Sequence, residues 1–322
     1  MDFLLKVVAF FIAVVPVALI AFYVRRRNIH KIYSDTSIFK VFALGMLIGF
    51  PIGFVEEFLA WVVGGYLEST AFYIYESYFI AGFVEETFKI LAIAWIVYDR
   101  KDFNQRMDGI VFCVVAALGF SFHENLVYMF QYYPEHSFFI AIQRAILCTP
   151  GHALMTGIAG YFVAVAKYEG RAHRAYEDFY VIIGWISAIF LHGTWNFLLS
   201  QFGGLEMYEG GWVVYAQWLL LPIEFLILRH LINKSVVHDA SRPGAVRVKK
   251  QAFTLRWMII PPLEFAHRKL SKLAGTPLPE EVRHFDARAV VRPGVYINKG
   301  DIVLPRPSQR IAVTKRAFIN RT

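Results

Sequence analysis

Long apolar runs dominate the chain and limit what it can fold into. Hydrophobic residues make up 57% of its 322 residues and charged residues only 18%, whereas a soluble domain carries about 25% charged residues. The runs reach about twenty residues or more, the length at which a helix crosses a hydrocarbon core roughly 30 Å thick. In lipid, every backbone N–H and C=O needs a partner within the chain, so such runs must be helical. The sequence therefore predicts an all-α polytopic membrane protein.

Seven such runs predict about seven transmembrane helices. They are Phe3–Val24, Val41–Gly65, Ser77–Tyr98, Asp108–Phe130, Phe138–Ala166, Phe179–Leu199 and Gly211–Leu228. Positive charge follows the first run, at Arg25–Arg27, which is the reverse of a cleaved signal peptide. We therefore expect the first helix to be retained. Glycines four residues apart, Gly45, Gly49 and Gly53, favour close packing of the second helix against a neighbour.

Lysine and arginine alternate between the predicted loops. The loops after the first, third and fifth helices are basic, whereas Tyr66–Glu76, Gln131–Ser137 and Ser200–Gly210 contain neither Lys nor Arg. Positively charged short loops remain cytoplasmic. The pattern therefore predicts a multi-pass protein of the cell membrane with its amino terminus extracytoplasmic and its carboxyl terminus cytoplasmic.

The composition changes after Leu228, which divides the chain into a transmembrane helical domain, residues 1–228, and a basic cytoplasmic tail, residues 229–322. The tail holds nineteen Lys or Arg against six Asp or Glu, while the whole chain has a net charge of only +8. We expect the tail to lie against anionic lipid headgroups. No nucleic-acid-binding module is recognisable, so no nucleic acid is expected. Strand-like pieces between Val290 and Val313 leave room for a small β-rich piece.

Ionisable side chains inside the predicted helices mark the candidate site, because each costs at least about 2.5–3.5 kcal/mol at the centre of a bilayer. They occur on five of the predicted helices. The residues are Glu56, Glu57, Glu85, Glu86, Lys89, His123, Glu124, Arg144, His152 and His192, with Asn196 one turn after the last. Lys89 is four residues from Glu85 and three from Glu86, so it can pair with either carboxylate on one helix face.

The depth of these residues predicts one shared polar layer. At 1.5 Å per residue, Glu85 lies about 12 Å, Glu124 about 9 Å and His192 about 10 Å from the outer ends of their helices. The layer is therefore in the outer half of the membrane. His152 comes out at about 21 Å, so we expect the fifth helix either to start later or to be displaced at Pro150-Gly151. His123 lies about 100° around its helix from Glu124 and is expected to be a neighbour of the site.

Acids and imidazoles in one dry layer favour hydrolytic chemistry. A glutamate there can take a proton from water and return it to a leaving amine. Two histidines and a glutamate, with His152, His192 and Glu124 as the candidates, would form a zinc site with an open position. A histidine and Asn196 could instead stabilise an oxyanion without a metal. Structural roles are the alternatives: a buried ion pair at Lys89, an interhelical hydrogen bond at His192, and an arginine at position 144 that snorkels outward or pairs with a glutamate.

Four motifs in order carry a resemblance to a known family. They are Glu85-Glu86-Thr87-Phe88-Lys89, Phe120 to Glu124-Asn125, Thr149-Pro150-Gly151-His152-Ala153 and His192-Gly193-Thr194-Trp195-Asn196. Over about residues 40–200 the chain resembles the PrsW family of intramembrane proteases. That family shares a superfamily with the CAAX prenyl-protein proteases and the anterior-pharynx-defective subunit of γ-secretase.

The resemblance implies an intramembrane endopeptidase that cuts membrane-anchored proteins near the external face, an anti-sigma factor being the best-known type of substrate. It implies that Glu85 and Glu86 activate water and that Glu124, His152 and His192 complete the site. The matched motifs also contain Lys89 and Asn196. The resemblance does not decide between a metal, with zinc as the candidate, and a glutamate-activated water. Two other functions stay open: a non-catalytic scaffold or sensor subunit of the superfamily, and a proton-coupled transporter.

Overall fold

The computed structural model describes residues 3–30, 33–67, 69–169, 174–202 and 213–241. Nearly all of these residues are helical, and no strand occurs among them. They all belong to one compact unit. The possible β-rich piece and most of the predicted basic tail lie outside the described residues.

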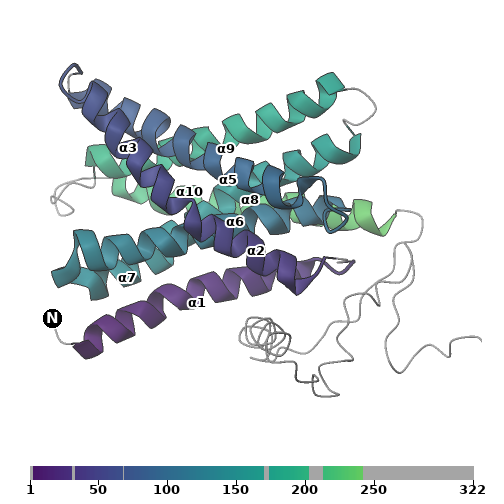
Figure 1. The fold of residues 1–322 in the computed structure, drawn as a ribbon, viewed down its shortest axis with the longest axis horizontal. Coiled ribbons are helices and arrows are strands. Elements are labelled where there is room, and N and C mark those ends of the chain that lie inside the picture. The colour runs from purple at the N-terminus through teal and green to yellow at the C-terminus, as the bar shows by residue number, and fades with distance from the viewer. Residues whose placement is uncertain (1–2, 31–32, 68, 170–173, 203–212, 242–322) are drawn as a thin grey trace, which may run out of the picture. The chain divides into compact units, whose positions relative to one another are not determined.

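The described residues form helices that follow the predicted apolar runs. The α-helices are α1 (Phe3–Arg27), α2 (Asp35–Leu47), α3 (Gly49–Val63), α4 (Ser69–Ile74), α5 (Glu86–Ile93), α6 (Arg106–Val127), α7 (Ser137–Ile146), α8 (Cys148–Glu169), α9 (Arg174–Phe202) and α10 (Val213–Ala240) (Figure 1). Three π-helices, η1 (Tyr75–Glu85), η2 (Ala94–Tyr98) and η3 (Tyr128–Tyr132), and one 3₁₀ helix, η4 (Pro134–His136), continue or connect them. The last α-helix runs past Leu228, the predicted end of the transmembrane domain.

Five of these helical stretches are long and apolar enough to cross a membrane, so the chain is a multi-pass membrane protein. The stretches are Phe3–Arg27, Asp35–Val63, Arg106–Tyr132, Pro134–Tyr168 and Tyr176–Leu199. The stretch from α4 to η2 contains Glu85, Glu86 and Lys89, so apolarity alone does not identify it as a span. The predicted number of seven membrane crossings stays a prediction.

Two predicted helices are broken, in each case just before a proline. The second predicted helix divides at Ile48 into α2 and α3, and the fifth divides at Leu147 into α7 and α8. Proline has no N–H and clashes with the carbonyl four residues earlier, so Pro51 and Pro150 each interrupt the preceding helix. The fifth predicted helix is thus interrupted next to Pro150-Gly151, which is one of the two alternatives expected from the sequence. His152 lies about 6 Å along α8 from its start.

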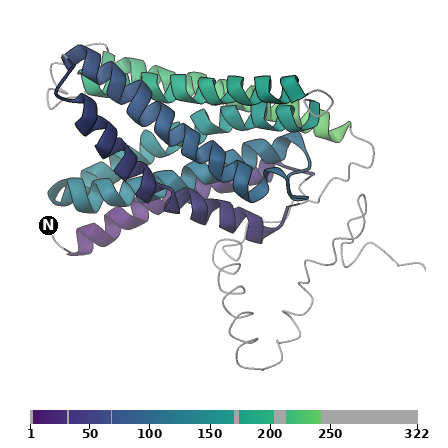
Figure 2. The same cartoon turned by 45° about the horizontal axis from the view of Figure 1, so that its top comes forward.

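Helix α6 lies at the centre of the bundle and packs against α8, α2 and α1 (Figures 1 and 2). Its contact with α2 depends on glycine. A Cβ atom added at Gly45 would lie 2.2 Å from the backbone oxygen of Ala116, and one at Gly119 would lie 2.1 Å from that of Phe42. Small residues allow two helix backbones to approach this closely. The predicted close packing is confirmed at Gly45, whereas a Cβ at Gly53 would meet nothing within 4 Å.

Polar contacts tie the carboxyl ends of α1 and α10 to the amino end of α6. Asn28 Nδ2 donates to Asp108 Oδ1 at 2.8 Å, and the Asp239 carboxylate accepts hydrogen bonds from the backbone N–H groups of Arg106 and Met107 at 3.0 and 2.9 Å. An acidic side chain on these free N–H groups satisfies them and interacts favourably with the helix dipole. These contacts fix the carboxyl ends of α1 and α10 against the start of α6.

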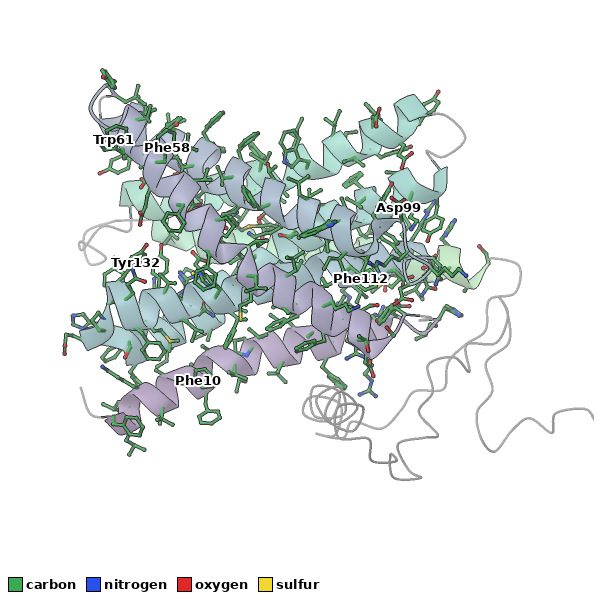
Figure 3. The ribbon with its side chains drawn as sticks, in the orientation of Figure 1. Phe10, Phe58, Trp61, Asp99, Phe112 and Tyr132 are labelled. Atoms are coloured by element: carbon green, nitrogen blue, oxygen red, sulfur yellow. The ribbon has the colours of Figure 1, made fainter. Side chains whose placement is uncertain are left out.

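Side chains of opposite burial show which surfaces of the bundle face outward. Phe112 of α6 is fully buried among the helices, whereas Trp61 at the end of α3 is 79% exposed (Figure 3). Asp99 and Tyr132, which belong to loops predicted on opposite sides of the membrane, lie toward opposite ends of the bundle (Figure 3). The direction in which the bundle crosses the membrane stays a prediction.

Candidate functional site

The Lys89 ammonium group lies in the middle of the candidate site and is fully buried. Its Nζ atom lies 3.0 Å from Oε2 of Glu85 and 2.8 Å from Oε1 of Glu86. It also lies 3.2 Å from Nδ1 of His152 and 4.2 Å from the ring centre of Phe120. An ammonium has three donors and no acceptor. Each donor of Lys89 therefore has an acceptor, and the lysine joins α5, η1 and α8.

The Glu86 carboxylate has partners on both oxygens. Besides Lys89, Oε1 faces Nδ1 of His192 at 3.0 Å, and Oε2 accepts a 2.7 Å hydrogen bond from the hydroxyl of Thr156. Glu86 has no exposed surface. Buried charges persist in dry surroundings only when they are paired and hydrogen-bonded, and Glu86 meets that requirement through donors on three helices.

Glu85 is less constrained than its neighbour. Its Oε2 atom contacts Lys89 and lies 3.7 Å from Nε2 of His192 and 3.9 Å from Nδ1 of His152. Among the described residues, the structure records no polar partner for its Oε1 atom. Glu85 is also slightly exposed, at 4%. Of the two adjacent carboxylates, Glu85 is thus the one with an oxygen available to another molecule.

A local change in helix geometry positions the two carboxylates. The π-helix η1 ends at Glu85, and α5 begins at Glu86. A π-helix has wider turns than an α-helix and occurs frequently at functional sites. The transition changes the angular offset between successive side chains at the point where both Glu85 and Glu86 face His192.

The two nitrogens of His152 have different partners. Nδ1 faces Lys89, and Nε2 lies 2.8 Å from Oε2 of Glu124. Because an ammonium cannot accept a hydrogen bond, Nδ1 is the acceptor and Nε2 carries the proton that is donated to Glu124. Histidines that bind metals commonly donate their other N–H to a carboxylate in this way. Glu124 therefore contacts the side of His152 that faces away from Lys89.

Four residues of the cluster could hold a metal ion. Glu85, Glu86, His152 and His192 each offer one ligand atom, and these atoms lie within 4.8 Å of one another. Carboxylate oxygens and imidazole nitrogens are ligands that Zn²⁺ accepts. This group does not include Glu124, which was also a candidate ligand, because Glu124 is bonded to the far nitrogen of His152.

Other predicted residues lie beside the cluster. Asn196 is partly buried one turn after His192, and within the described residues it has no recorded polar contact with the cluster. The His123 ring packs on Phe50 of α3, with ring centres 4.5 Å apart, and does not join the site. On α3, Glu57 is exposed, whereas Glu56 has a buried Oε1 atom with no hydrogen-bond partner in the described part of the chain.

Glu224 on α10 was not singled out from the sequence. It is fully buried, and neither carboxylate oxygen has a hydrogen-bond partner among the described residues. The side chains of Leu221 and Leu228 on α10 lie 3.9 and 3.1 Å from the positions of a Cβ at Gly151 and Gly157. The part of α10 that contains Glu224 therefore packs against α8 near His152. The signal was available, since Glu224 is an acid in an apolar run.

Comparison with known proteins gives consistent matches. Residues 35–227 match the family model described as PrsW family intramembrane metalloprotease. The chain is 29% identical over 231 residues to "Protease PrsW" of Clostridioides difficile (strain 630), which covers 71% of this chain and 90% of that protein. It is 30% identical over 209 residues to "Protease PrsW" of Shouchella clausii (strain KSM-K16), covering 65% and 91%.

A third relative, "Protease PrsW" of Bacillus subtilis (strain 168), is 29% identical over 182 residues, which covers 56% of this chain and 78% of that protein. No solved structure matches the chain significantly. The matched residues include all four motifs of the buried cluster.

Proposed function

Because the chain belongs to the PrsW family of intramembrane metalloproteases, we propose that it is an endopeptidase that cuts membrane-anchored proteins near the extracytoplasmic face, with Glu85 activating the attacking water. One observation carries this proposal. Two carboxylates, two imidazoles and a lysine meet in the interior of a helical membrane protein, and the Oε1 atom of Glu85 has no recorded partner among the described residues.

Glu85 is proposed as the general base and then the general acid. Its carboxylate takes a proton from water as the oxygen attacks the scissile carbonyl carbon. Glu85 then gives this proton to the leaving amide nitrogen as the C–N bond breaks. A positioned carboxylate in such a role contributes typically 10²- to 10⁴-fold in rate, a range given to order of magnitude.

Glu86, Lys89 and His192 are proposed to hold this base in place. Lys89 bonds both carboxylates, at 3.0 and 2.8 Å, and so keeps Glu85 directed into the site. Glu86 anchors Lys89 and His192 through the same oxygen. The positive charge of Lys89 also stabilises negative charge that develops on the substrate.

The donor set fits a zinc ion with an open position. Glu86, His152 and His192 would hold it, since their ligand atoms lie within 4.8 Å of one another, and Glu85 would remain the base. A zinc ion bound there would supply Lewis-acid polarisation of the peptide carbonyl and of the attacking water. Glu124 would orient His152 through its far nitrogen, which lies 2.8 Å away. Without a metal, His192 and Asn196 are the proposed donors to the oxyanion.

The proposal also covers the substrate, the orientation in the membrane and the role of the basic tail. We propose a membrane-anchored protein such as an anti-sigma factor as the substrate, with the amino terminus of the enzyme extracytoplasmic and its carboxyl terminus cytoplasmic. Residues 1–228 form the catalytic domain, and the basic residues 229–322 bind anionic lipid headgroups.

A comparison of protein termini tests the proposal. Membranes of cells expressing the wild type or Glu85→Gln at equal levels are compared for new amino-terminal peptides. We expect new termini just outside transmembrane segments with the wild type only. Identical profiles in cells where the wild type does produce new termini would exclude Glu85 as the base. Termini on the cytoplasmic side would contradict the proposed orientation.

A further inference from the structure

Arg144 is a buried arginine that the proposed chemistry does not use. It lies in the last turn of α7, three residues before the break at Leu147, and only 6% of its surface is exposed. Its guanidinium group is fixed at three points on α6 and η3. Nη2 forms an ion pair with Oε2 of Glu124 at 2.6 Å, Nε donates to Oδ1 of Asn125 at 2.7 Å, and the group stacks 4.1 Å from the ring centre of Tyr128.

The oxygen that Arg144 binds is also the oxygen that holds His152. Oε2 of Glu124 lies 2.6 Å from Arg144 and 2.8 Å from Nε2 of His152. The two residues therefore reach one oxygen atom from the two sides of the α7–α8 break. If Glu124 moved, the ring of His152 would lose the bond that fixes its tautomer and its orientation.

Asn125 fastens the same arrangement to the first turn of α8. Its Oδ1 accepts from Arg144, and its Nδ2 donates to the hydroxyl oxygen of Thr149 at 3.0 Å. Ser121 donates to the same oxygen at 3.1 Å. Because arginine has only donors, the bond to Arg144 determines which way the amide of Asn125 points. The arginine thus fixes both Glu124 and the start of the helix that carries His152.

Arg144 also balances the charge of Glu124. Lys89 is shared by Glu85 and Glu86, so its charge is already matched twice over. The Glu124 side chain is only 20% exposed, so it needs a cation of its own, and Arg144 provides it. A planar guanidinium can bond two acceptors in a fixed geometry, which the point charge of a lysine does not do.

From these contacts we infer that Arg144 is a positioning residue for the protease reaction, which orients His152 through Glu124. The inference rests on the proposed function, because it takes His152 as a residue of the active site. Removing a hydrogen-bonded partner behind a metal ligand or catalytic histidine typically lowers metal affinity or activity about 10- to 100-fold.

A double-mutant cycle distinguishes this role from a purely structural one. Arg144→Gln, Glu124→Gln and the double variant are compared with the wild type by the rate at which new amino termini appear in membranes, per folded molecule. The zinc affinity of each purified protein is measured as a second readout. We expect each single variant to lose about 10- to 100-fold and the double variant to lose no more than Glu124→Gln alone.

Two further variants control for folding. Arg144→Lys keeps a cation beside Glu124, so it should fold like the wild type. Its rate of cleavage per folded molecule should still be lower, because a lysine cannot bond Glu124 and Asn125 in the fixed geometry of a guanidinium group. Arg106→Gln removes another buried arginine, at the opposite end of α6, and should leave the rate per folded molecule unchanged.

Two results would overturn the inference. One is an Arg144→Gln protein with the wild-type rate and zinc affinity. The other is a double variant whose loss is the product of the single losses, since Arg144 would then act independently of Glu124. Neither result bears on the proposed base, which is tested separately by Glu85→Gln in the same membranes.

Discussion

The Nζ atom of Lys89 lies 3.2 Å from Nδ1 of His152, so an ammonium group lies among the donor atoms that could hold a metal ion. The same ammonium contacts Glu85 and Glu86 at 3.0 and 2.8 Å. Zinc binds such donors at about 2.0–2.2 Å. An ion in the group and the ammonium in its present position would therefore compete for the same atoms.

We predict that Lys89→Met strengthens zinc binding. The variant removes a competing positive charge and leaves the carboxylates free to bind the ion. The expected gain in affinity is about 10-fold or more, equivalent to about 1.4 kcal/mol. Calorimetric titration of the detergent-solubilised protein with zinc measures it. The matched control is Lys167→Met. It removes another buried lysine, which lies about 22 Å along α8 from His152. Weaker zinc binding by Lys89→Met would show that the lysine supports the ion.

Glu85→Gln and Glu86→Gln should differ in stability although both should impair cleavage. Glu86 accepts hydrogen bonds on both oxygens and is fully buried, whereas Glu85 has an oxygen without a recorded partner in the described residues. An amide at position 86 turns an acceptor into a donor that faces another donor, at a cost of about 1–3 kcal/mol. Thermal unfolding in detergent should show a lower Tm for Glu86→Gln than for Glu85→Gln. Equal Tm values would contradict the difference inferred from their contacts.

Gly119→Ala should destabilise the contact between α2 and α6. The added methyl group would lie 2.1 Å from the backbone oxygen of Phe42. Forcing an extra carbon into a packed interior costs typically about 1–3 kcal/mol. Gly53→Ala is the matched control, since its Cβ meets nothing within 4 Å and alanine favours a helix by about 0.5–1 kcal/mol. The two Tm values should therefore move in opposite directions, and a shift in the same direction would argue against this packing.

Glu224→Leu should stabilise the protein. The Glu224 carboxyl group is fully buried and lacks a hydrogen-bond partner among the described residues. Burying such a group without a partner costs about 1–3 kcal/mol by protein mutational data, so an apolar side chain of similar size should raise the Tm. The exposed Glu57→Leu serves as the control, with an expected change within about 0.5 kcal/mol. A fall in Tm for Glu224→Leu would mean that the carboxyl group has a stabilising partner.

The sequence was sufficient for those features that depend on local rules. Apolar runs predicted the helices, because backbone groups in lipid must pair within a segment. The spacing of Glu85, Glu86 and Lys89 predicted an ion pair, because residues three and four apart share a helix face. The four motifs led to the family that the comparisons show.

The tertiary structure decided which of these side chains meet. Asn196 and His192 are spaced for one helix face, yet His192 alone contacts the carboxylates. Arg144 was compatible with snorkelling or pairing until the break at Leu147 placed it on the same oxygen as His152. Periodicity fixes the relative directions of side chains on one helix, but the rotation, tilt and breaks of each helix follow from packing against its neighbours. Contacts between helices, and hence the composition of the site, could therefore be read only from the assembled bundle.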